Sequence, residues 1–203
     1  MMIRMPNSRP VLLPAATLVL LGLALLALPG CSTMDRMLSM VGLSDENAGP
    51  ETPDGMVMEG VEAFNLGKYS AALKIFEDLR DRYPFSRYSL LADLKVADCK
   101  YYLDEYGEAL SLYEEFENNH PTNEAIPYVL FQIGMCHYKR IGTIDRDTSG
   151  AVSAIQAFSR QIRSYPSSPY FSEATARIKA AQDFLARHEM YVAVFYVRSS
   201  EYS

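Results

Sequence analysis

The sequence predicts an all-α fold built from stacked antiparallel helix pairs. Two segments, 67–84 (GKYSAALKIFEDLRDRYP) and 104–121 (DEYGEALSLYEEFENNHP), align with each other at a spacing of 37 residues. In both segments apolar residues recur at helical spacing and a proline closes the run. A repeat of this length is the signature of proteins made from identical supersecondary units. The chain is therefore expected to repeat one helix–turn–helix unit.

The first unit shows how the pattern works mechanically. Its first helix ends near Gly67, and its second helix ends at Pro84 because proline has no N–H to donate and disfavours helical geometry in the preceding residue. Gly60 and Ala72 are small enough for the two helices to approach closely. Phe76 is expected to fill the space between this pair and the next.

Three further units follow along the chain. The second repeats the pattern and closes at Pro121. The third consists of helices in 126–141 and 149–166, and its additional residues lie between these helices, around GTIDRDTS. A fourth unit begins with a helical stretch at 168–188.

These intervals and the placement of small and aromatic residues are typical of tetratricopeptide repeats. Residues 55–203 are thus predicted to form a right-handed superhelix, whose concave face in such proteins holds extended peptides or partner helices. Residues 193–202 resemble residues 60–69, which lead into the turn of the first unit. By the same spacing, a second helix of this unit is expected to follow beyond Tyr202. Because the sequence ends at Ser203, we expect about four repeats, the last incomplete or followed by a missing fifth.

The N-terminus has the features of a bacterial lipoprotein signal. Residues 1–30 contain two arginines and then the uncharged apolar run 11–28, which together predict an export signal. Cys31 follows LPG directly and resembles the lipidated cysteine of a lipobox, while Ser32 resembles the next residue of lipoproteins sent to the outer membrane. An uncleaved membrane anchor and a buried structural cysteine are the alternatives. Several acyl chains on Cys31 would hold the protein to the membrane.

Composition limits the partners of the folded part. Residues 31–54 mix serine, glycine, proline and acidic residues without a sustained period, and predict a flexible lipidated tether. The net charge of the chain is −6, and it becomes −8 without residues 1–30, which hold two arginines and no acidic residue. An acidic body argues against nucleic acid as a partner, since phosphate backbones are bound by clustered lysine and arginine.

Four segments resemble the BamD family, the outer-membrane lipoproteins of the β-barrel assembly machinery: YPFSRYSLLADL (83–94), HPTNEAIPYVLFQIG (120–134), DRDTSGAVSAIQAFSRQIRSYPSSPY (145–170) and LARHEMYVAVFY (185–196). The resemblance implies binding of unfolded outer-membrane precursors near the N-terminal repeats and docking of the barrel-forming subunit near the C-terminal ones. This sequence departs from the family in a short insertion in the third unit, in Phe184 where relatives tend to carry arginine, and in the missing fifth repeat.

Aromatic residues are the candidates for substrate binding, because their rings supply contact area at low entropic cost. Tyr83, Phe85 and Tyr88 flank the first turn between units, and Tyr101 and Tyr102 lie on the following helix. We expect these five residues to form an aromatic groove for a precursor segment that ends in an aromatic residue. Candidate partner-binding residues lie in the later units: Asp145, Arg146, Asp147, Arg163 and Arg187.

Metal binding is not indicated. The three histidines lie in no ligand motif: His120, His137 and His188. The segment DRDTSG (145–150) matches the opening of a calcium loop, but the twelfth position of that loop requires glutamate and here is Gln156. Capping of the next helix by Asp147, Thr148 or Ser149 explains the segment better.

Cys99 and Cys136 also stand 37 residues apart. Equivalent positions on neighbouring helices of a stack lie about 8–10 Å apart, whereas a disulfide needs Cα atoms within about 7 Å. Free, mostly buried thiols are therefore predicted in place of a disulfide.

Taken together, these features predict a non-enzymatic scaffold on the periplasmic face of the outer membrane, without any cofactor except the covalent lipid on Cys31. Its expected partners are β-barrel assembly subunits, unfolded outer-membrane protein precursors and the membrane itself. The alternative is a generic tetratricopeptide lipoprotein, such as a pilotin or a cell-envelope coordinator. A hydrolase is disfavoured because no pairing of nucleophile and base is visible.

Overall fold

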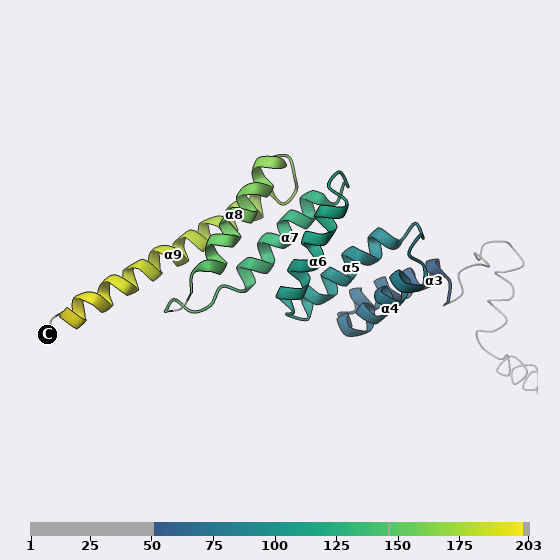
Figure 1. Cartoon of the computed structure of the whole chain (residues 1–203), viewed down its shortest axis with the longest axis horizontal. Coiled ribbons are helices and arrows are strands. Elements are labelled where there is room, and N and C mark those ends of the chain that lie inside the picture. The colour runs from purple at the N-terminus through teal and green to yellow at the C-terminus, as the bar shows by residue number, and fades with distance from the viewer. Residues whose placement is uncertain (1–50, 146, 201–203) are drawn as a thin grey trace, which may run out of the picture. The chain divides into compact units, whose positions relative to one another are not determined.

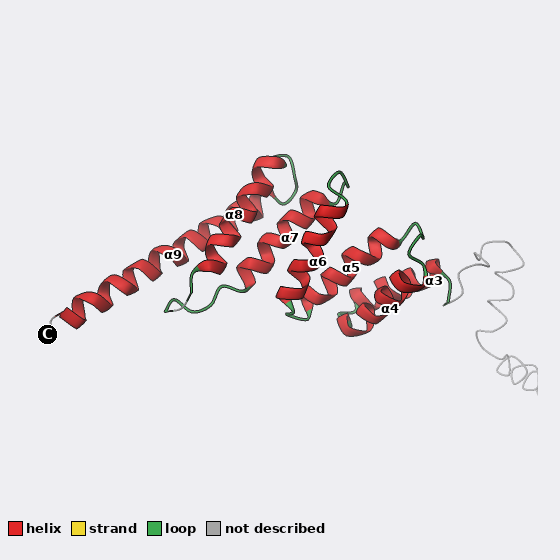
Figure 2. Ribbon diagram, viewed as in Figure 1, coloured by secondary structure: helices red, strands yellow, loops and turns green. Residues whose placement is uncertain are grey.

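The computed structural model describes residues 51–145 and 147–200, which belong to one compact unit. These residues form seven α-helices and no strand (Figure 2). The all-α prediction is thereby confirmed. The helices are α3 (Pro53–Asn65), α4 (Tyr69–Arg82), α5 (Ser89–Tyr102), α6 (Tyr106–Asn119), α7 (Ile126–Lys139), α8 (Ser149–Ser164) and α9 (Phe171–Ser200).

Each helix packs against the next one along the chain, and α7 also contacts α9. Neighbouring helices run antiparallel, so that α3/α4, α5/α6 and α7/α8 form three successive pairs (Figure 1). Short turns join most of the helices, and a longer loop over residues 140–148 joins α7 to α8. This arrangement confirms the predicted stack of helix pairs. Because contacts are made mainly between neighbours, the stability of such a stack is close to a sum of pair and interface contributions.

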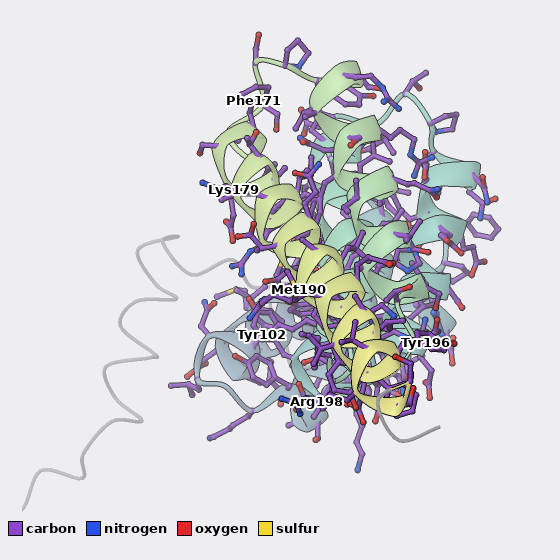
Figure 3. The ribbon with its side chains drawn as sticks, turned by 90° about the vertical axis from the view of Figure 1, so that its left-hand side faces the viewer. Tyr102, Phe171, Lys179, Met190, Tyr196 and Arg198 are labelled. Carbon is purple, nitrogen blue, oxygen red and sulfur yellow. The ribbon has the colours of Figure 1, made fainter. Side chains whose placement is uncertain are left out.

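Helix α9 is longer than any other described helix. It runs for 30 residues, and the two segments expected at 168–188 and 193–202 lie largely within this one continuous helix. Its C-terminal half projects past the end of α8 and exposes large apolar side chains such as Met190 and Tyr196 (Figures 1 and 3). Within the described part of the chain, no helix combines the length and apolar character that crossing a bilayer requires.

The folded unit begins slightly before the predicted end of the tether at residue 54. Helix α3 starts at Pro53, a residue suited to the first helical turn because its missing N–H needs no partner there. The side chain of Thr52 caps this end by accepting a hydrogen bond from the backbone N–H of Gly55 (3.2 Å). The predicted signal peptide, Cys31 and most of the tether lie outside the described residues.

The turns inside the first two pairs share one backbone geometry. Gly67 and Asp104, 37 residues apart, both have positive φ angles, of 73° and 63°. Each directly follows the C-terminal cap of a helix, where a left-handed residue ends the helix and glycine is preferred. Aspartate is one of the few other residues that adopt this conformation at modest cost.

A small residue faces an aromatic ring inside each of the three pairs. A Cβ atom added to Gly60 would lie 2.8 Å from the ring of Phe76, and one added to Gly134 would lie 2.5 Å from the ring of Phe158. The equivalent residues of the middle pair are Ala97 and Tyr113, both buried. The predicted close approach of the helices at Gly60 is confirmed, whereas the ring of Phe76, which was expected to fill the space toward the next pair, packs on Gly60 inside the first pair.

The third pair carries one polar residue in a core position. Gln161 is fully buried at the place that Leu79 and Phe116 occupy in the earlier pairs. Neither polar atom of its amide has a hydrogen-bond partner among the described residues. Burial of unpaired polar atoms costs about 1–3 kcal/mol, so the α7/α8 pair is stabilised less well here than the pairs before it.

We predict that Gly134→Ala destabilises the fold by about 1–3 kcal/mol, because the new methyl group overlaps the ring of Phe158 and forces both helices to shift. Gly107→Ala is the matched control, since a Cβ atom at this helical position has no neighbour within 4 Å. The control is expected to be neutral or more stable by about 0.5–1 kcal/mol. Urea unfolding followed by circular dichroism measures both changes, and equal effects of the two substitutions would contradict the packing described.

Candidate functional site

The turns that connect one pair to the next follow a common pattern. We call residues 83–88 the first turn, residues 120–125 the second turn and residues 165–170 the third turn. Each starts with an aromatic or histidine residue followed by proline, and the three leading residues have nearly the same backbone angles: Tyr83 (φ −131°, ψ 55°), His120 (φ −133°, ψ 53°) and Tyr165 (φ −136°, ψ 65°). The stack therefore presents three variants of one surface feature.

The first turn is held against the start of α3. The hydroxyl of Tyr83 donates a hydrogen bond to the backbone carbonyl of Glu51 (2.7 Å), and the hydroxyl of Tyr88 donates to the carboxylate of Asp54 (2.6 Å). The guanidinium of Arg87 pairs with the same carboxylate and lies 4.7 Å from the centre of the Tyr88 ring. The hydrogen bond from Tyr88, together with Arg87, lowers the pKa of Asp54. The first turn is thus fixed by polar contacts at both of its ends.

Phe85 lies between these two anchors and is 99% exposed. No packing inside the fold accounts for a large apolar ring in this position. A fully exposed ring on a fixed turn can bind an apolar side chain of another polypeptide with little loss of conformational entropy. Of the five predicted substrate-binding residues, Phe85 is the one most available for contact.

Tyr101 and Tyr102 lie at the opposite end of α5 from the first turn. The helix has 14 residues, so its ends are about 20 Å apart. Tyr101 is a core residue whose pKa is raised to about 12, chiefly by burial. Tyr102 is 48% exposed and stacks on Tyr69 with ring centres 4.7 Å apart, while Phe64 meets the Tyr102 ring edge-on. The structure therefore does not bring the five residues into one groove: three belong to the first turn and two to a separate aromatic cluster.

A buried polar network joins α5, α6 and α7, and the sequence did not indicate it. One carboxylate oxygen of Asp98 accepts hydrogen bonds from the hydroxyls of Tyr113 and Tyr128, both 2.6 Å long. The other oxygen accepts from the ammonium of Lys95 (2.9 Å), and the amide of Gln132 donates to the Tyr128 hydroxyl (2.9 Å). Three donors satisfy the buried carboxylate, so the network is a structural link between two pairs.

The candidate partner-binding residues fall into two places. The Nδ1 atom of His188 lies 2.6 Å from the carbonyl of Ile144, which ties the loop between α7 and α8 to the middle of α9. Asp145 and Asp147 of that loop, and Arg187 beside His188, are exposed. Arg163 lies at the other end of α8, next to the third turn. Arg146 is outside the described residues.

Asp147 has a structural role at the start of α8. Its carboxylate accepts a hydrogen bond from the backbone N–H of Ser149 (2.9 Å) and another from the Ser149 hydroxyl, and these bonds lower the pKa of Asp147. Asp147 thus bonds to the first residue of α8 across Thr148, the N-cap residue, whose own side chain makes no capping hydrogen bond. Among the residues that the structure describes, no group of three or more histidine, cysteine or acidic residues is placed to hold a metal ion.

A family model described as an outer membrane lipoprotein, YfiO, matches residues 51–203. The chain belongs to this family. Among its curated relatives, the outer membrane protein assembly factor BamD of Neisseria gonorrhoeae is 31% identical over 191 residues, which cover 87% of this chain and 68% of the relative. BamD of Vibrio cholerae is 29% identical over 186 residues, covering 87% and 73%. Among solved structures, PcrH from Pseudomonas aeruginosa is similar over 66% of this chain, with 22% identity and a TM-score of 0.44.

The two described cysteines of this family member are buried and not bonded to each other, as predicted. Burial raises the pKa of both Cys99 and Cys136 to about 12. Because the thiolate is the reactive form of cysteine, neither thiol is reactive at neutral pH in the folded protein. These residues contribute to packing.

We predict that Tyr113→Phe destabilises this family member by about 1.5–3 kcal/mol, since it removes one donor from a buried carboxylate without changing the packing of the ring. Tyr69→Phe is the matched control, because no hydrogen bond of the Tyr69 hydroxyl exists within the described part of the chain. Its free energy of unfolding is expected to change by less than about 0.5 kcal/mol. Denaturant unfolding of both variants tests the network, and a Tyr113→Phe protein as stable as the control would show that Asp98 does not depend on this donor.

Proposed function

We propose that this chain is a lipoprotein component of the β-barrel assembly machinery, which binds unfolded outer-membrane protein precursors and scaffolds the complex on the periplasmic face of the outer membrane. The observation that carries the proposal is the family match, because it spans 51–203 and thus includes every described helix. The relatives in that family are named outer membrane protein assembly factors. A stack of helix pairs without a metal cluster among its described residues suits binding and scaffolding rather than catalysis.

Attachment to the membrane is assigned to Cys31. The basic and apolar signal in residues 1–30 and the LPGC motif support cleavage before this cysteine and acylation of it, and residues 32–50 would then span the distance to the helical unit. The description of the family as outer membrane lipoproteins supports the same assignment.

Precursor binding is assigned first to the first turn. Phe85 offers a fully exposed ring, and the hydrogen bonds of Tyr83 and Tyr88 to the start of α3 hold that ring in place. A precursor segment that ends in an aromatic residue would gain ring-to-ring contact there. At the far end of α5, the half-exposed Tyr102 would provide a second contact, whereas Tyr101 belongs to the core and supports it from inside.

Binding of assembly subunits is assigned to the charged surface where the α7–α8 loop meets α9. Asp145, Asp147 and Arg187 provide both signs of charge over this short region, which suits a partner with complementary charges. Arg146 is proposed for the same role from the sequence alone. Arg163 would belong to a separate contact near the third turn.

We predict that Phe85→Ala weakens the binding of a precursor peptide roughly ten-fold, which is the effect of losing a central aromatic contact. The peptide is a short copy of the last strand of a β-barrel precursor and ends in phenylalanine. The fold should be unaffected because Phe85 is exposed. Leu66→Ala is the control: this residue is 61% exposed and lies at the other end of α3 from the first turn. Fluorescence anisotropy measures the affinities. Unchanged affinity in a normally folded Phe85→Ala protein would remove the first turn from the precursor site.

A further inference from the structure

A cleft of about 750 Å³ opens between the second and third turns. Its volume is within the range of sites that bind small ligands or short peptide segments. Three tyrosines and three prolines provide most of its walls: Pro127, Tyr128, Tyr165, Pro166, Pro169 and Tyr170. No feature of the proposed precursor site at the first turn contributes to it.

The walls of the cleft are rigid. The Tyr170 ring stacks on the core residue Phe131 with centres 5.1 Å apart and an interplanar angle of 20°, and it lies 5.7 Å from the ring of Tyr128. Pro127 is in the first turn of α7, and two prolines restrict the backbone of the third turn. A site of this kind loses little conformational entropy when a ligand binds.

Two of the three phenol hydroxyls at the cleft have no hydrogen-bond partner among the described residues. The hydroxyl of Tyr128 is already bonded to Asp98. Within the described residues, by contrast, the hydroxyls of Tyr165 and Tyr170 make no hydrogen bond, although both residues line the cleft. The phenol groups can therefore donate to carbonyl oxygens of a bound ligand.

The charge within the lining of the cleft is negative, and the cation nearest to it in sequence, Arg163, precedes the lining residue Ser164 without lining the cleft. Glu124 is the only Asp, Glu, Lys or Arg residue in the lining, and it is exposed at the N-terminal side of α7. The chain as a whole is also acidic, with a net charge of −6. Both facts favour a ligand that carries a positive charge next to its apolar part.

We propose that this cleft binds a proline-containing extended segment of a partner polypeptide with a basic residue beside the prolines. Such a segment adopts the polyproline II conformation, in which the backbone carbonyls have no internal partner and proline contributes no N–H. Its rings pack on tyrosine and proline surfaces, its carbonyls accept hydrogen bonds from Tyr165 and Tyr170, and its basic side chain pairs with Glu124. The proposal is independent of precursor binding at the first turn.

The test uses the full chain in mild detergent and three labelled peptides of equal length. The first contains two Pro-Pro pairs flanked by arginine, the second has alanine in place of every proline, and the third has glutamate in place of arginine. Fluorescence anisotropy is expected to show binding of the first peptide with a dissociation constant of about 10–100 μM and at least roughly ten-fold weaker binding of the other two. Absence of binding up to about 1 mM, or equal affinity for the three peptides, would overturn the proposal.

Variants then locate the binding site on the protein. Tyr165→Phe combined with Tyr170→Phe keeps both rings and is expected to weaken binding of the first peptide about five-fold by removing two donors. Glu124→Lys is expected to reverse the preference between the arginine and glutamate peptides, whereas Glu189→Lys, an exposed charge reversal on α9, should leave it unchanged.

Phe85→Ala separates this proposal from the precursor site, because it should weaken binding of the precursor peptide and leave the affinity for the proline peptide unchanged. Loss of proline-peptide binding in Phe85→Ala, or full affinity in both the double Tyr→Phe variant and Glu124→Lys, would place the peptide elsewhere and contradict the assignment.

Discussion

The close approach of a small residue to an aromatic ring is the contact on which each helix pair depends. Gly60 touches Phe76 and Gly134 touches Phe158 so closely that neither glycine has room for a Cβ atom. The distance between paired helices is set by this contact. Because protein interiors are close-packed, a fixed distance within each pair also fixes where the next pair can sit.

Because the helix pairs repeat one packing pattern, the surface differs from pair to pair mainly in the connecting turns. All three turns between pairs begin with nearly the same backbone angles, but they carry different side chains. The first turn exposes Phe85 between two hydrogen-bonded anchors, whereas the second and third turns form a cleft with tyrosine and proline walls. A repeated scaffold can thus hold several different binding surfaces in fixed order, which is what an assembly factor with several partners requires.

Residue spacing alone was sufficient to predict the helix pairs, the close approach of the first two helices at Gly60 and the unpaired state of Cys99 and Cys136. The network around Asp98 could not be predicted in this way, since Tyr113 and Tyr128 lie on other helices, 15 and 30 residues along the chain. The expected aromatic groove failed for a geometric reason: an entire helix separates its two halves. Gln161, a buried amide at an otherwise apolar position, follows from no repeat rule.

We propose that this member of the outer membrane lipoprotein family works within the β-barrel assembly machinery. The most direct measurement is affinity purification of the tagged full chain from detergent-solubilised cell envelopes, followed by mass spectrometry of the proteins that accompany it. We expect enrichment of β-barrel assembly subunits together with outer-membrane protein precursors. Enrichment of secretin subunits or peptidoglycan enzymes in their place would contradict it and would identify the chain as a scaffold of another envelope complex.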